Sequence, residues 1–216
     1  MYEIRRQQIN YANLKDTFVH ECFIYVVAYY LKKSANEALR YILNKTYFVG
    51  TEHLNQDADS YDCFYFYNDV LDNAVCKRDN KNYYSGAAEL WIQNINVEVC
   101  NKGEFVSGDL LCHSASLLIS NYNEDWEWFP LTYVYSSDRY GGLFATCSKK
   151  LVSKEHLEEM IFILGFESMD TFKEQYKNVE EKFHKGELKE YRYNSCFETA
   201  KNFWNYMKAE GLGTRN

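Results

Sequence analysis

The sequence has few of the features that interrupt helices or carry a chain into a membrane. It contains one proline, Pro130, in 216 residues, where average usage of about 5% would give roughly ten. The longest apolar run, residues 22–31, is about half the length that a membrane-spanning helix needs. No apolar stretch of the secretory type follows the first charged residues. These absences predict a soluble, cytoplasmic protein with few built-in helix breakers.

Sequence motifs for common chemistry are also missing. The seven cysteines are scattered from Cys22 to Cys196 without a C-x-x-C pair, which excludes a zinc ribbon and argues against a disulfide framework. The chain has no G-x-G-x-x-G, P-loop, G-x-S-x-G or H-E-x-x-H pattern. It also lacks the His-x-Glu and C-x-x-C pair of a zinc deaminase. We therefore expect reduced thiols, most of them buried, and no cofactor.

The composition is that of one globular domain over residues 1–216. Hydrophobic residues make up 46% and charged residues 25%, as in ordinary folded proteins, and no repeat or linker divides the chain. Aromatic residues are abundant, with 20 Tyr, 14 Phe and 4 Trp. They could form a core and its rim, or an aromatic binding surface. Abundant Tyr, Asn, Phe and Lys also fit an AT-rich genome, as in many bacteria and phages.

The negative charge is concentrated in the middle of the chain. Residues 51–148 carry 5 Lys or Arg against 15 Asp or Glu, a net charge of −10, whereas residues 149–216 carry 12 of each and residues 1–50 are mildly basic. An acidic segment repels phosphates, so direct nucleic-acid binding is disfavoured. The same charge attracts a basic protein surface. We therefore predict a protein partner with a basic surface.

The predicted fold class is helix-rich α+β, beginning with a helical hairpin. Residues 16–31 have a wide apolar face that is typical of a central buried helix. A second helix is predicted from Ser34, where Glu37 stands at the capping-box position. The apolar positions of these two helices are Phe18, Cys22, Val26 and Tyr30 with their neighbours, and then Leu39, Ile42 and Leu43.

The middle and the end of the chain mix helix and strand signals. A helix is predicted over 61–75 with Ser60 as its cap, and residues 86–99 start as helix and finish as strand. Gly103 and Gly108 bracket a predicted turn, and a short helix over 110–122 follows with Leu111, Ala115 and Leu118 inward. Aromatic and β-branched residues around the turn 138–142 predict a β-hairpin over 128–147 in a small antiparallel sheet, with Pro130 on an edge strand. The helical C-terminal part, residues 149–216, contains three predicted helices, over 153–165, 170–185 and 195–207. Ser153 is the predicted cap of the first, and Gly165 is its predicted stop.

Three residue groups are candidates for chemistry. His53, Asp57, Asp59 and Asp62, beside Glu52, could hold a hard cation or simply form a solvated acidic loop. Cys112 and His113 are adjacent, so on a helix their side chains diverge and cannot act on each other directly. The Glu187-Leu188-Lys189 spacing resembles part of a nuclease site but arises often by chance.

The segment 121–128 concentrates carboxylates and aromatic rings just ahead of the predicted hairpin. Such residues could hold an Arg-rich partner by ion pairing and cation–π contact. In the alternative reading the two tryptophans anchor a strand and the acidic residues face water. The predicted partner-binding residues are Tyr122, Glu124, Asp125, Trp126 and Glu127, with Asp138, Arg139 and Tyr140 at the hairpin tip.

The sequence therefore favours a non-catalytic interaction protein, such as an inhibitor, adaptor or regulatory subunit, that binds a basic partner through an acidic, aromatic-rich surface. A special case is a mimic of nucleic acid. The alternative is an enzyme, either a metal-dependent hydrolase using the carboxylates of residues 52–62 or a nucleotide-processing protein.

Overall fold

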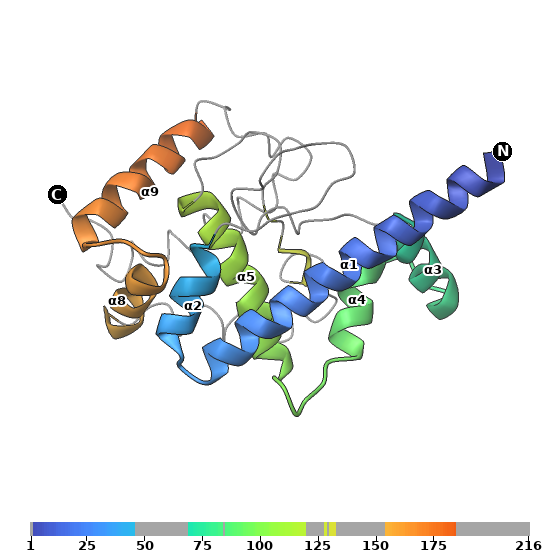
Figure 1. The fold of residues 1–216 in the computed structure, drawn as a ribbon, viewed down its shortest axis with the longest axis horizontal. Helices are drawn as coiled ribbons and strands as arrows, with labels where there is room; N and C mark the ends of the chain where they lie inside the picture. Colours follow the sequence, from blue (N-terminus) through green and yellow to red (C-terminus); the bar gives the residue numbers. More distant parts are fainter. Residues whose placement is uncertain are drawn as a thin grey trace.

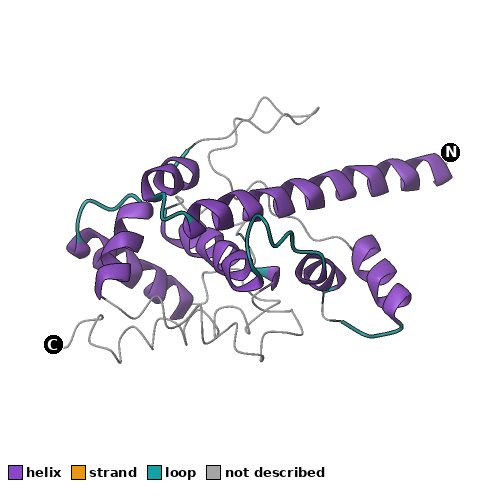
Figure 2. Ribbon diagram, turned by 90° about the horizontal axis from the view of Figure 1, so that it is seen from below, coloured by secondary structure: helices purple, strands orange, loops and turns teal. Residues whose placement is uncertain are grey.

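The computed structural model describes residues 2–45, 69–83, 85–119, 128, 130–132 and 154–184. Within these ranges the regular structure is helical (Figures 1 and 2). The helices are α1 (Tyr2–Lys32), α2 (Asn36–Leu43), α3 (Asp69–Asp79), α4 (Gly86–Gln93), α5 (Lys102–Leu118), α8 (Lys154–Ile163) and α9 (Met169–His184). No helix within these ranges is long and apolar enough to cross a membrane.

Helices α1 and α5 cross at the centre of the molecule (Figure 1). They approach closely at Gly108 of α5, where an added Cβ would lie 3.1 Å from the backbone nitrogen of Ala28 and 3.2 Å from the carbonyl oxygen of Ile24. Gly103 and Gly108 were expected to bracket a turn. Instead both lie inside α5, because the capping box of Asn101 and Glu104 starts the helix at Lys102.

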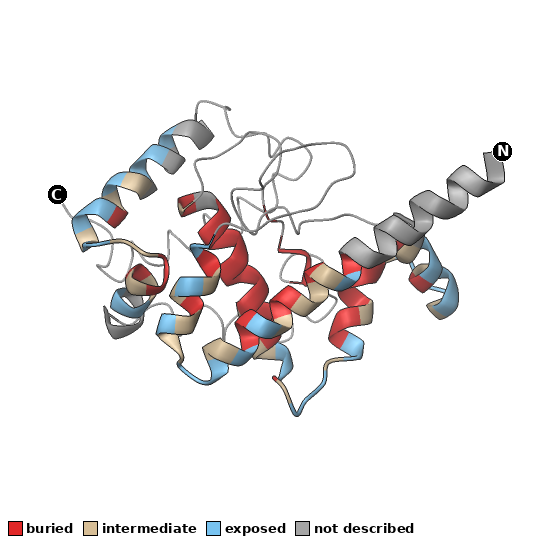
Figure 3. Ribbon diagram, viewed as in Figure 1, coloured by how far each residue is buried: buried red, intermediate tan, exposed pale blue. Residues whose placement is uncertain are grey.

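Helix α5 is more completely buried than α1. Figure 3 shows α5 buried along nearly its whole length, whereas α1 has an exposed side. In α1, Ile24 and Val27 are fully buried, but Phe18 and Val26 are 64% and 42% exposed. The prediction that α1 is buried on several sides was therefore wrong for one row of its apolar residues.

A tight turn joins α1 to α2. Ser34 adopts a positive φ of 51°, and the amide of Ala35 donates to the carbonyl of Tyr30. Ala35 is the N-cap of α2 and makes no side-chain capping bond, so the predicted Ser34 capping box is not formed. The predicted inner residues Leu39 and Leu43 are buried.

Helices α3 and α4 pack against each other through a buried polar contact. The Asp72 carboxylate accepts hydrogen bonds from the Ala87 amide at 2.7 Å and the Ser85 hydroxyl at 3.2 Å. Ser85 in turn caps α4 by accepting from the Ala88 amide. After α4 the chain turns through residues 94–100, where a strand was expected. Residues 60–68, with the expected Ser60 cap, lie outside the described ranges.

The small antiparallel sheet is the main correction to the predicted fold. The described residues contain no strand, and Leu131 and Thr132 are helical. The backbone amide and carbonyl of Trp128 bond to side chains of α5, and the Thr132 amide bonds to Asp109. Because these backbone groups already have partners, they cannot form a strand ladder there. Residues 133–147 of the expected hairpin lie outside the described ranges.

The C-terminal helices agree well with the sequence where they are described. Gly165 ends α8 with a φ of +84°, and the amide of Phe166 reaches back to the carbonyl of Ile161, as in a glycine helix stop. Phe172 of α9 is buried and meets Phe166 edge to face. The expected cap Ser153 and the third helix over 195–207 lie outside the described residues.

Candidate functional site

The main cluster of buried polar side chains lies on one face of α5. Asp109, His113 and Ser116 follow each other at spacings of four and three residues, so they form one stripe along the helix. Their exposed fractions are 0%, 2% and 1%. A polar stripe in a buried helix must find its hydrogen-bond partners inside the protein, since water cannot supply them.

All three residues of this stripe bind Trp128. The indole Nε1–H of Trp128 donates to Asp109 Oδ1 at 2.8 Å, and its backbone N–H donates to the Ser116 hydroxyl oxygen at 3.2 Å. Its carbonyl oxygen lies 2.7 Å from His113 Nδ1. The Ser116 hydroxyl proton is directed to the carbonyl of His113 at 2.9 Å. The last turns of α5 thus hold the backbone and the side chain of Trp128.

Asp109 also positions the residue at the far end of this short segment. Its second oxygen, Oδ2, accepts from the Thr132 amide at 2.8 Å and from the Thr132 hydroxyl at 2.6 Å. Together with Trp128 Nε1, one buried carboxylate therefore receives three hydrogen bonds. These three bonds fix Trp128 and Thr132 against α5.

Helix α1 and helix α4 complete the surroundings of Trp128. The ring of His20, from α1, stacks on Trp128 with 4.0 Å between ring centroids, and on Trp91 of α4 at 5.3 Å. Phe23 meets Trp128 at 5.7 Å in a tilted arrangement. Trp128 and His20 are 0% exposed. The site is therefore a packed interior cluster in which α5 and α1 hold Trp128, and Trp91 of α4 stacks on the His20 ring that covers it.

The buried environment determines the protonation state of His113. Because a carbonyl oxygen can only accept, the short contact with Trp128 places the proton of the neutral ring on Nδ1. Burial lowers the pKa of His113 to about 4, while the bond to Trp128 opposes this shift. His113 is therefore neutral at physiological pH, and its chemistry is that of a fixed hydrogen-bond donor.

The neighbouring thiol is equally unsuited to nucleophilic chemistry. Cys112 is 0% exposed. Burial, followed by the charge of Asp109, raises its pKa well above the ordinary value. Because only the thiolate is a good nucleophile, Cys112 behaves as a small core residue. The earlier interpretation of a buried cysteine on a helix is thus supported by its surroundings.

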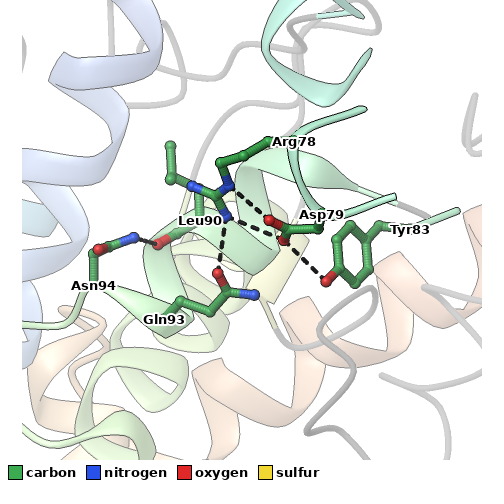
Figure 4. Close-up of polar contacts among 6 residues, drawn as sticks. All are labelled: Arg78, Asp79, Tyr83, Leu90, Gln93 and Asn94. Carbon is green, nitrogen blue, oxygen red and sulfur yellow. Dashed lines mark hydrogen bonds and ion pairs between the residues drawn. The ribbon is translucent and has the colours of Figure 1, made fainter. Parts of the chain in front are cut away.

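A second polar cluster lies on the surface, between the end of α3 and the end of α4 (Figure 4). Arg78 Nε lies 2.7 Å from Asp79 Oδ1, and Arg78 Nη2 donates to Gln93 at 3.0 Å. The hydroxyl of Tyr83 donates to Asp79 at 3.0 Å. Hydrogen bonding to Arg78 is the main cause that lowers the pKa of Asp79 to about 2. This cluster joins α3 to α4 and holds Asp79 ionised.

The predicted site residues lie outside the described ranges. This applies to the partner-binding residues Tyr122, Glu124, Asp125, Trp126, Glu127, Asp138, Arg139 and Tyr140, and to the possible metal ligands His53, Asp57, Asp59 and Asp62. Those predictions therefore remain untested. Among the residues that the structure does describe, no group of three or more His, Cys, Asp or Glu is arranged to hold a metal ion.

The acidic surplus of residues 51–148 is not all on the surface. Asp72, Glu89 and Asp109 are buried. Glu104 closes the capping box of α5, and Asp79 pairs with Arg78. Asp72, Asp79, Glu104 and Asp109 thus bind other groups of the protein. A basic partner would have to pair mainly with the acidic residues outside the described ranges.

The sequence interpretation missed the Asp109, His113 and Ser116 stripe. The sequence predicts a short helix over 110–122 with Leu111, Ala115 and Leu118 inward, which leaves the opposite face to solvent. The polar residues at positions 109, 113 and 116 were a usable signal of one helix face, but only after the helix start at Lys102 was known.

Comparisons with known proteins give no relative for this chain. No family model, no curated protein and no solved structure matches it.

Proposed function

We propose that this protein is a non-catalytic interaction protein, an inhibitor, adaptor or regulatory subunit of the cytoplasm, that binds a basic protein partner. The binding residues would be Tyr122, Glu124, Asp125, Trp126 and Glu127. The residues Asp138, Arg139 and Tyr140 would extend the surface. The partner would supply Arg or Lys side chains, which pair with carboxylates and stack on aromatic rings.

The observation that carries this proposal is the attachment of Trp128 to α5. The acidic segment follows α5, whose last residue is Leu118, and ends at Trp128, which binds Ser116 and His113. Both ends of the segment are therefore attached to the same end of one buried helix. Attaching both ends of a segment reduces the conformational entropy that it loses when a partner binds.

The chemistry of the described interior also favours binding over catalysis. His113 is held neutral with its Nδ1 proton committed to Trp128, and burial raises the pKa of the Cys112 thiol. The Asp109 carboxylate receives bonds from Trp128 and Thr132. An enzyme would place such groups where a substrate can reach them. Here they serve to position the backbone.

The proposal is tested by a pull-down with the tagged full chain at low and at high salt, with mass spectrometry of the retained proteins. We expect a stoichiometric basic protein that is lost at high salt, because ion pairs at exposed sites are screened. The charge reversal Glu124→Lys with Asp125→Lys and Glu127→Lys should abolish its retention. Equal retention by the reversed variant would contradict the proposal.

The alternative enzyme is examined with a thermal-shift measurement in the presence of Mg²⁺, Mn²⁺, Zn²⁺ and common nucleotides. A ligand that binds only the native state raises the apparent stability. A concentration-dependent rise that disappears in the variant Asp57→Asn with Asp59→Asn and Asp62→Asn would favour a metal-dependent hydrolase over an interaction protein.

A further inference from the structure

Helix α1 carries a row of apolar side chains that stays exposed when the helix packs on α5. Phe18, Val26 and Tyr29 are 64%, 42% and 41% exposed, and the half-buried Cys22 lies between the first two. Spacings of four, four and three residues place all four on one side of a helix. The exposed row ends at Lys33, whose Nζ lies 5.7 Å from the centre of the Tyr29 ring. Figure 3 shows exposed positions along this part of α1.

The loop after α4 extends this apolar surface. The Asn96 amide donates to the Tyr25 hydroxyl at 3.0 Å, and Lys32 Nζ donates to the Val99 carbonyl at 3.2 Å. The loop is therefore held along α1, and Val97, which lies between these two contacts, is 75% exposed. Of the five large apolar side chains that are exposed among the described residues, four thus belong to α1 or to this adjoining loop. Exposed apolar side chains gathered in one place indicate an interface.

The exposed row is complementary to itself when its direction is reversed. If two copies of α1 lie antiparallel with a two-fold axis beside Val26, Phe18 comes level with Lys33 of the second copy. Cys22 then comes level with Tyr29 of the second copy. A lysine beside an aromatic ring makes a cation–π contact, and the pairing sets no two like charges of the row against each other. A two-fold contact of this kind uses the same surface on both copies.

The charged residues beside the row fit the same arrangement. Glu21 and Lys32 are eleven residues apart in α1, about three helical turns, so they lie along the same flank of the row. In the antiparallel pairing, Glu21 lies within one helical turn of Lys32 of the second copy. Glu21 is half-buried, burial raises its pKa, and the ion pairs among the described residues do not include it. A second copy would therefore give this carboxylate a cation, twice in each dimer.

We propose that α1 packs antiparallel on α1 of a second copy of this chain, and that the exposed row is the centre of a reversible homodimer. This inference goes beyond the proposed function and does not depend on it. Val97 of each copy would lie beside the two-fold axis, because its loop is held against residues 25–32 of α1. One helix and one loop from each copy form a small interface, so we expect the two copies to exchange with monomers.

The first experiment is sedimentation velocity of the full chain over a hundredfold range of protein concentration. Phe18→Lys sets a lysine against Lys33 of the second copy, so it should weaken the dimer at least about tenfold. Tyr41, in α2, is 63% exposed and lies outside the row. Tyr41→Lys is therefore the matched control and should dimerise as wild type does. Circular dichroism and the melting curve verify that each variant folds.

An exchange of charges tests the antiparallel pairing. Glu21→Lys brings two lysines together across the interface and should weaken the dimer about threefold to tenfold. Adding Lys32→Glu to this variant should restore most of the lost affinity. Within one chain the two positions are about 16 Å apart along the helix, so the recovery can come only from a contact between copies.

Cross-linking gives a test that needs no change of charge. Residues 22 and 29 come level across the two-fold axis, whereas within one helix they are about 10 Å apart, too far for a disulfide bond. Mild oxidation of Tyr29→Cys should therefore link it to the native Cys22 of the second copy. Tyr41→Cys is the control and should remain uncross-linked.

The outcomes that would overturn the proposal are distinct. Wild-type protein that stays monomeric at every concentration would overturn the homodimer. A dimer that Phe18→Lys leaves intact, or that Tyr41→Lys weakens equally, would show that the row is not its interface. Glu21→Lys that Lys32→Glu does not rescue, together with no cross-link from Tyr29→Cys, would overturn the antiparallel pairing.

Discussion

The indole Nε1–H of Trp128 donates to the buried carboxylate of Asp109 at 2.8 Å, across nineteen positions of sequence. The same carboxylate receives the amide and the hydroxyl of Thr132. Asp109 is 0% exposed, so its bonds are made in a region of low dielectric constant, where they are strong and where their loss is costly. Through Asp109, α5 holds both Trp128 and Thr132 in the core of the protein.

Removing the Asp109 carboxylate should destabilise the fold severely. In Asp109→Ala the indole of Trp128 and both donors of Thr132 lose their acceptor, and leaving buried donors unsatisfied should cost about 3 kcal/mol or more. Asp109→Asn should also destabilise the fold. Each carboxylate oxygen accepts a hydrogen bond from an N–H, so the amide group of the asparagine would point its own N–H at one of these two donors. Urea denaturation measures both. Wild-type stability of Asp109→Asn would contradict the bonding pattern.

His113 should make the stability of the protein depend on pH. Its folded pKa of about 4 lies below the ordinary 6.5, so below pH 6.5 the unfolded chain takes up a proton that the folded one does not. Holding His113 neutral therefore costs the protein nothing above pH 6.5. As the pH falls from 6.5 to 4, the free energy of unfolding should decrease by about 3 kcal/mol.

Denaturation of wild type and His113→Asn between pH 4 and 7 measures this dependence. The asparagine amide can still donate to the Trp128 carbonyl but does not titrate, so the variant should lose stability less steeply. Parallel curves for the two proteins would show that His113 is not held neutral.

Gly108 should not tolerate a side chain. Alanine normally stabilises a helix interior by about 1 kcal/mol relative to glycine. At position 108, however, the Cβ would lie 3.1 Å from the Ala28 nitrogen and 3.2 Å from its Cβ, and these atoms are held by α1. We expect Gly108→Ala to lower stability by about 1–3 kcal/mol, as measured in urea. Gly103→Ala, in the first turn of α5, is the control and should not destabilise.

The surface ion pair of Arg78 and Asp79 should affect the pKa of Asp79 but contribute little to the stability of the fold. The Arg78 side chain is 49% exposed, and exposed ion pairs contribute little. Arg78→Ala should leave the melting temperature nearly unchanged, while the pKa of Asp79 rises from about 2 towards its ordinary 3.8. Carboxyl chemical shifts followed through an acid titration measure this rise. A pKa that stays near 2 would mean that Arg78 is not its cause.

The sequence predicted best those elements whose signals are local. The Gly165 stop and the helix that follows it were found because a glycine with positive φ and an apolar periodicity need no tertiary information. The inner residues Leu39 and Leu43 of α2 were found for the same reason.

The missed features depend on contacts between distant residues. Gly108 was read as a turn, but its role is to let α1 approach α5. Trp128 begins a stretch with strong β-propensity, yet Ser116, His113 and Asp109 take its polar groups. Propensity for a strand has a weak effect compared with burial and hydrogen bonding in a core. The polar stripe could be recognised only once α5 was known to begin at Lys102 and to be buried over residues 108–116.

Hydrogen exchange of the Trp128 indole tests most directly whether α5 holds this residue in the core. The resonance is assigned among the four tryptophans by its absence in Trp128→Phe, and its exchange is followed by NMR at neutral pH. Because the Nε1–H is buried and bonded to Asp109, it should exchange only when the protein unfolds, at a rate that urea accelerates accordingly. Exchange as fast as that of a solvent-exposed indole would contradict the anchoring of Trp128.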